Sequence, residues 1–131
     1  MGLRKDAATV AGLLVSVVDD DESVLESLPA LLKASGFDPR AFSSAAEFLS
    51  SDYVHRTQCL ILDIAMPNMN GLELQQELRL RGQKIPIVFI TAQTDDAVQA
   101  RALEQGAVSV LLKPFSKTDL LAAIRAALRT S

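Results

Sequence analysis

The chain has 131 residues, of which 49% are hydrophobic, and its 13 basic and 16 acidic side chains give a net charge of −3. This length fits one compact domain, and the balanced charge argues against a nucleic-acid-binding surface, which needs clustered basic residues. No apolar run approaches the ~20 residues of a membrane helix, and the N-terminal stretch is too polar for a secretory signal. Cys59 is the single cysteine, which excludes an internal disulfide and favours a cytoplasmic location.

The apolar pattern predicts five strands that alternate with five helices. Residues 1–12 are expected to form a flexible N-terminal arm, and residues 13–131 a single domain. The strands are expected over residues 13–18, 37–42, 59–62, 85–90 and 108–112. The helices are expected over residues 23–36, 45–49, 72–81, 94–105 and 116–129. Pro39 predicts an edge position for the second strand because it cannot donate a ladder hydrogen bond, and Pro29 predicts a kink in the first helix.

Alternating strands and helices form a parallel sheet covered on both faces, because the crossovers between parallel strands are right-handed. We therefore predict an α/β fold of the flavodoxin-like type, a doubly wound five-stranded sheet in the order 2-1-3-4-5. Four of these strands end in polar residues that carry chemistry. The residues are Asp19 and Asp20 after the first strand, Asp63 after the third, Thr91 after the fourth and Lys113 after the fifth.

These four strands are neighbours in the predicted order, so their ends converge on the crevice where open α/β sheets bind ligands. Three carboxylates there repel one another unless a cation lies among them, and Mg²⁺ suits a shallow site with oxygen ligands. Lys113 and Thr91 offer an ammonium group and a hydroxyl to the oxygens of a transferring phosphoryl group. Asp63 is then the expected nucleophile, which would form an acyl phosphate.

Four motifs carry a family resemblance. They are Val17-Val18-Asp19-Asp20-Asp21, Leu62-Asp63-Ile64-Ala65-Met66-Pro67-Asn68-Met69-Asn70-Gly71, Ile90-Thr91-Ala92 and Leu112-Lys113-Pro114-Phe115. In this order and spacing the chain resembles the receiver domain of bacterial two-component response regulators, which has a CheY-like fold, over residues 15–129. Residues 22–24 and 43–49 are most similar to receivers of the FixJ-like transcription-factor class.

The resemblance implies that Asp63 accepts a phosphoryl group from a histidine kinase, and that Thr91 and Lys113 bind the phosphoryl oxygens. It implies a Mg²⁺ site with these ligands: Asp19, Asp20, Asp63 and the backbone carbonyl of Ala65. It also implies a cis peptide bond between Lys113 and Pro114. Such a protein is a switch that catalyses only its own phosphorylation and dephosphorylation, and not a turnover enzyme.

In this family the helix at 94–105, the strand at 108–112 and the last helix form the output surface, which is therefore the candidate surface for a partner or a second copy of the chain. Two positions depart from the common pattern. Val110 stands where much of the family has an aromatic residue that turns inward when the threonine moves, and a β-branched side chain is stiff. Ala65 is small where longer side chains are common, and together with Gln93 it lines the approach of water to Asp63.

Other classes fit less well. A hydrolase of the haloacid-dehalogenase type needs a second aspartate at the position of Ala65, and a flavodoxin needs a phosphate loop where residues 19–22 are all acidic. The glycine-rich motif of P-loop nucleotide hydrolases is absent from the sequence. The alternative left open is a pseudo-receiver that acts as an interaction or dimerisation module without phosphorylation, because Val110 replaces the usual aromatic residue.

Overall fold

The computed structural model describes residues 12–130, so residues 1–11 of the predicted arm lie outside the described residues. One five-stranded sheet runs in the order β2-β1-β3-β4-β5, and every neighbouring pair is parallel. This confirms the predicted fold class and strand order. The strands are β1 (Leu14–Val18), β2 (Asp38–Phe42), β3 (Cys59–Asp63), β4 (Ile87–Thr91) and β5 (Ser109–Leu112).

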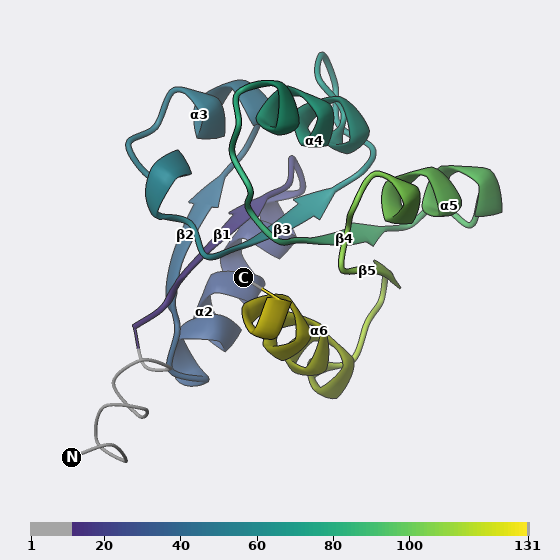
Figure 1. Cartoon of the computed structure of the whole chain (residues 1–131). Coiled ribbons are helices and arrows are strands. Elements are labelled where there is room, and N and C mark those ends of the chain that lie inside the picture. Colours follow the sequence, from purple (N-terminus) through teal and green to yellow (C-terminus); the bar gives the residue numbers. More distant parts are fainter. Residues whose placement is uncertain (1–11, 131) are drawn as a thin grey trace.

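Among the described residues, four α-helices connect successive strands and a fifth follows β5, and together they cover both faces of the sheet. They are α2 (Glu22–Ala34), α3 (Ala45–Leu49), α4 (Gly71–Leu80), α5 (Asp96–Glu104) and α6 (Lys117–Thr130). In the view of Figure 1, α3, α4 and α5 lie above the sheet and α2 and α6 lie below it. The described residues contain no helix that is long and apolar enough to cross a membrane.

Local sequence signals explain where several helices begin. The Asp21 carboxylate accepts a hydrogen bond from the Ser23 backbone N–H and so caps α2, which runs through Pro29 as one helix. Asn70 and Glu73 form a reciprocal capping box at the start of α4. The kink predicted at Pro29 stays a prediction. A short 3-10 helix, Val54–Arg56, was not predicted from the sequence.

The core has one layer on each face of the sheet. Alternate residues of β1, β3 and β4 point to opposite faces, and all three strands are buried along their length. Phe48 of α3 and Leu74 of α4 belong to one cluster, whereas Leu32 of α2 and Ile124 of α6 belong to the other. The outer strands β2 and β5 are largely half-buried, as expected for sheet edges and as Pro39 predicts for β2.

Candidate functional site

The ladder register brings the ends of four strands to one edge of the sheet. Val18 of β1 pairs with Leu62 of β3. Asp63 of β3 pairs with Ile90 of β4, and Thr91 of β4 pairs with Leu112 of β5. The polar residues that the sequence predicts for this edge therefore come from adjacent strand ends. Asp19 and Asp20 follow β1, Asp63 ends β3, Thr91 ends β4 and Lys113 follows β5.

Three of these residues form an acidic cluster. One carboxylate oxygen from each of Asp19, Asp20 and Asp63 lies within 4.8 Å of the others. Asp19 is fully buried and Asp63 is 4% exposed, whereas Asp20 is exposed to solvent. A hard cation with a preference for carboxylate oxygens fits this donor set, and the open side at Asp20 leaves room for the water ligands that Mg²⁺ retains.

Lys113 lies between the two buried carboxylates. Its Nζ atom donates a hydrogen bond to Asp19 Oδ2 at 2.8 Å and lies 3.5 Å from Asp63 Oδ1. The other oxygen of Asp19 accepts a hydrogen bond from the Asp21 backbone N–H at 2.9 Å. Because a buried carboxylate is costly without partners, these contacts compensate for the burial of Asp19.

The arrangement changes the proton affinity of Asp63 and of Lys113. Burial and, after it, the negative charge of Asp19 raise the pKa of Asp63, and Lys113 opposes both effects; the net result is a pKa of about 6. Burial disfavours the charged form of Lys113, but the hydrogen bond to Asp19 and the charges of Asp19 and Asp63 outweigh this, so the pKa of Lys113 is raised. The cluster thus holds excess negative charge at neutral pH, which a divalent cation would relieve.

Thr91 is 1% exposed and ends β4 beside the cluster. Its Oγ1 atom accepts a hydrogen bond from the Gln93 backbone N–H at 3.0 Å, and its carbonyl oxygen accepts one from the Lys113 backbone N–H at 2.8 Å. A threonine hydroxyl can also donate one hydrogen bond, so its proton remains for another acceptor. Thr91 and Lys113 are therefore held in fixed relation through the backbone.

The loop after β3 is fixed by a close contact at Gly71. The Gly71 backbone N–H donates to the Ile64 carbonyl oxygen at 2.8 Å. A Cβ atom at Gly71 would overlap the Asp63 carbonyl oxygen, and it would lie 2.9 Å from Ile64 Cα and 3.0 Å from Phe89 Cε1. The sequence analysis included Gly71 in one of the four family motifs but did not predict this contact. The sequence feature that could have predicted this contact is a glycine at the first position of a helix, where residues with a higher helix propensity are usual.

Ala65, one of the two positions that depart from the family pattern, lies near the site together with Gln93. Ala65 and Gln93 both line a hollow of about 440 Å³, together with residues of α4 and α5. Ala65 is exposed, and the ligand role of its carbonyl oxygen stays a prediction. The Lys113–Pro114 bond is cis, which confirms the expectation drawn from the resemblance.

A parallel 2-1-3-4-5 sheet with an acidic crevice and a lysine at its carboxyl edge defines a CheY-like receiver. Residues 15–125 match the family model of the response regulator receiver domain. The chain therefore belongs to the receiver domains of two-component response regulators. Proteins of this family interact with histidine kinases.

Named relatives agree with this assignment. The response regulator protein TodT of Pseudomonas putida is 42% identical over 130 residues, which cover 98% of this chain and 56% of TodT. The transcriptional regulatory protein FixJ of Azorhizobium caulinodans is 39% identical over 119 residues, covering 91% of this chain and 56% of FixJ. The solved structure of the response regulator StyR superposes with a TM-score of 0.84 at 44% identity, covering 92% of this chain and 61% of that one.

The chain thus spans a little more than half the length of these curated relatives. The match to FixJ confirms the resemblance to FixJ-like receivers. The activities of the whole relatives belong to those proteins and are not assigned to this chain.

Proposed function

We propose that the chain is a phosphoryl-accepting switch in a phosphorelay, in which Asp63 takes the phosphoryl group of a sensor histidine kinase. One observation carries this proposal. The Asp63 carboxylate lies at a strand end, 3.5 Å from the Lys113 ammonium group and within one cluster with Asp19 and Asp20. A nucleophile, a fixed cation and a candidate metal site are what phosphoryl transfer to a carboxylate requires.

In the proposed reaction an oxygen of Asp63 attacks the phosphorus, and the bond between phosphorus and the kinase imidazole nitrogen breaks, so that imidazole leaves with the electron pair. Lys113 and the Thr91 hydroxyl donate hydrogen bonds to the phosphoryl oxygens. Asp19, Asp20, Asp63 and the Ala65 carbonyl oxygen are the proposed Mg²⁺ ligands. Bound Mg²⁺ would neutralise the negative charge that develops on the transferring group. The protein catalyses only its own phosphorylation and dephosphorylation.

The hydrogen bonds of Thr91 suggest how the signal leaves the site. A phosphoryl group adds about two negative charges at neutral pH and draws the Thr91 hydroxyl toward it. If Thr91 turns, its Oγ1 atom gives up the hydrogen bond from the Gln93 backbone N–H, which lies in the loop before α5. The loop and α5 then shift, and this biases an existing equilibrium between two states.

The proposed output surface consists of α5, β5 and α6. Leu103 of α5 and Leu112 of β5 are large apolar side chains with exposed fractions of 48% and 45%. Apolar side chains exposed on one surface favour association, so this surface is the candidate for a partner, including a second copy of the chain. We place this action in the cytoplasm and expect no nucleic acid to bind these residues directly.

A second candidate is a pseudo-receiver that associates with a partner without being phosphorylated. Val110 favours it, because this half-buried side chain packs against the core layer that includes Ala102 of α5, at the position where many receivers carry a mobile aromatic ring. The complete set of acidic residues, threonine and lysine favours the phosphorylated switch.

Intact-protein mass spectrometry after incubation with a phosphoramidate donor distinguishes the two candidates. We expect one phosphoryl adduct that requires Mg²⁺ and is absent in Asp63→Asn. Another receiver labelled in parallel establishes that the donor is active. If that control is labelled while this chain stays unmodified with Mg²⁺ present, the phosphoryl switch is wrong and the pseudo-receiver replaces it.

A further inference from the structure

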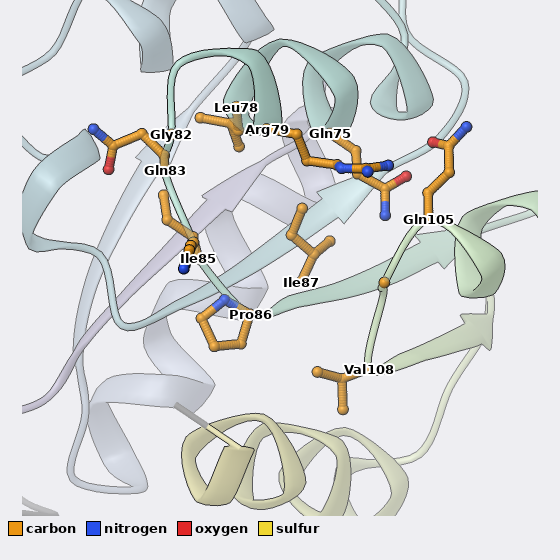
Figure 2. A pocket seen from close by; sticks show the side chains of 12 residues that line it. Gln75, Leu78, Arg79, Gly82, Gln83, Ile85, Pro86, Ile87, Gln105 and Val108 are labelled. Atoms are coloured by element: carbon orange, nitrogen blue, oxygen red, sulfur yellow. The ribbon is translucent and has the colours of Figure 1, made fainter.

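A second pocket lies near the ends of β4 and β5 where these strands begin, whereas the acidic cluster lies where the strands end. Figure 2 shows the residues that line this pocket. We call it the distal pocket. It has a volume of about 710 Å³ and is lined by Gln75, Leu78 and Arg79 of α4, by residues 82–87 and by part of the turn from α5 to β5. These segments precede β4 and β5, whereas Thr91 and Lys113 follow them, so the pocket is separate from the candidate phosphoryl site.

The inner wall of the distal pocket is apolar. Leu78, Ile87 and Val108 line it, and the first two are almost fully buried. Pockets that bind small organic molecules have volumes of about 300–1,000 Å³ and walls of this kind, with a few polar groups that orient the ligand. The distal pocket therefore has the size and apolar surface to hold the body of such a molecule.

Two polar atoms in this wall lack a partner. Gln75 is 2% exposed; its Nε2 atom donates to the Ala102 carbonyl oxygen of α5 at 3.2 Å, but its Oε1 atom accepts no hydrogen bond. Gln105 Oε1 is also buried and accepts none. Figure 2 shows the two amide groups turned toward each other. Buried acceptors are almost always paired, so a ligand that offers a hydrogen-bond donor would satisfy these oxygens.

The polar rim of the pocket is positively charged. Arg79 and Lys84 line it and are exposed to solvent, and the lining includes no acidic side chain. A ligand with a negative charge at its outer end would meet both cations, whereas a cationic ligand would be repelled. A ligand that carries both a negative charge and a hydrogen-bond donor would therefore match the cations of the rim and the two unpaired acceptors.

We propose that the distal pocket binds a small organic anion with a flat apolar body. An N–H or O–H group of the ligand donates to Gln75 Oε1 and Gln105 Oε1, and its carboxylate pairs with the cations Arg79 and Lys84. The apolar body packs on Leu78, Ile87 and Val108. This inference does not depend on phosphorylation of Asp63.

The test uses indole-3-acetate as the probe, because it combines a ring N–H, an apolar body and a carboxylate. Titration of the ¹⁵N-labelled chain, followed by ¹H–¹⁵N correlation spectra, should give saturable shifts confined to the distal pocket, including the side-chain amides of Gln75 and Gln105. The matched probe 1-methylindole-3-acetate lacks the donor and should bind about tenfold more weakly. Indole-3-ethanol lacks the negative charge and should bind about two- to fivefold more weakly.

Substitutions in the protein test the same contacts that the modified probes test. Gln105→Leu keeps the size of the side chain but removes the oxygen, so it should reduce the tenfold preference for the unmethylated probe. Arg79→Gln should reduce the preference for the acid over the alcohol. Arg81→Gln is the matched control, because this exposed arginine lies two positions further along and does not line the pocket. Gln75→Leu also removes the bond to Ala102, so Gln105→Leu carries the test if Gln75→Leu fails to fold.

Three results would overturn the proposal. The first is the absence of saturable shifts at the distal pocket. The second is equal affinity for the methylated and unmethylated probes. The third is a hydrogen bond between the side-chain amides of Gln75 and Gln105 in the free protein. It would appear as slow exchange of the Gln105 side-chain amide protons with solvent, at a rate that the probe does not change.

Discussion

Replacing Asp63 with asparagine should stabilise the folded protein when divalent cations are absent, and the gain should grow with pH. Burial and the charge of Asp19 raise the pKa of Asp63 from 3.8 to about 6. A carboxyl group whose pKa is raised by folding stabilises the fold while it is protonated. That contribution is fully present below the unfolded pKa and is lost as the pH rises through the folded pKa.

The size of the effect follows from the difference in pKa. A shift of about two units is worth about 3 kcal/mol between the fully protonated and fully ionised limits. Integration of the proton linkage places about 1.4 kcal/mol of this loss between pH 5 and pH 8. Asparagine has the shape of the protonated aspartate and does not ionise, so the variant avoids the loss.

Urea unfolding of both proteins at pH 5, 6.5 and 8 in EDTA measures this difference. The free energy of unfolding of Asp63→Asn minus that of the wild type should increase by about 1.4 kcal/mol over this range. Asp52→Asn is the control for the loss of one carboxylate, because Asp52 is exposed and is not a member of the acidic cluster. A constant difference for Asp63→Asn, or a variant less stable than the wild type at pH 8, would refute the reasoning.

Three further predictions concern the same edge of the sheet. Gly71→Ala should lower the free energy of unfolding by about 1–3 kcal/mol, because its Cβ overlaps the end of β3, and it should slow phosphoryl uptake. Gly36→Ala is the control: its Cβ meets no atom within 4 Å, so the rate of phosphoryl uptake should not change. Equal rates of uptake in the two variants would contradict the role of Gly71 in positioning the end of β3. Lys113→Met should lower the free energy of unfolding in EDTA by about 3 kcal/mol, because it leaves the buried Asp19 carboxylate unpaired. Urea unfolding of the double variant Lys113→Met with Asp19→Asn should show that most of this stability returns. If the stability does not return, the result would argue against the ion pair. Mg²⁺ at ten times its Kd should raise the free energy of unfolding of the wild type by about 1.4 kcal/mol, and thermal melts should show no such gain in Asp20→Asn if this residue is a ligand.

The sequence predicted the fold well because its signals are local. Buried strands are short apolar runs, and the residues that cap α2 and α4 directly precede them. The predicted bounds of most helices and strands differ from the observed bounds by one or two residues. For example, β4 begins at Ile87 instead of at residue 85, because Pro86 has no backbone N–H for the ladder. The 3-10 helix Val54–Arg56 was missed because three residues are too few to show a period.

The geometry of the site depends on contacts between distant residues, which one sequence does not reveal. The positions of Asp19 and Lys113 at strand ends were predictable, but their ion pair joins residues 94 positions apart. The contact between Gly71 and the end of β3 arises from the path of a loop. Gln75 lies in a helix whose other buried positions are mostly apolar, and only packing against α5 shows that one of its oxygens is unpaired.

The most direct test of the central claim is to locate the phosphoryl group in the chain. Borohydride reduces an aspartyl phosphate to homoserine, so reduction after phosphorylation, followed by peptide sequencing on a mass spectrometer, identifies the modified residue. We expect homoserine at position 63 when Mg²⁺ and the phosphoryl donor are present, and unmodified Asp63 when either is left out. Homoserine at Asp19 or Asp20, or labelling of position 63 that does not depend on Mg²⁺, would contradict the proposed roles of these three aspartates.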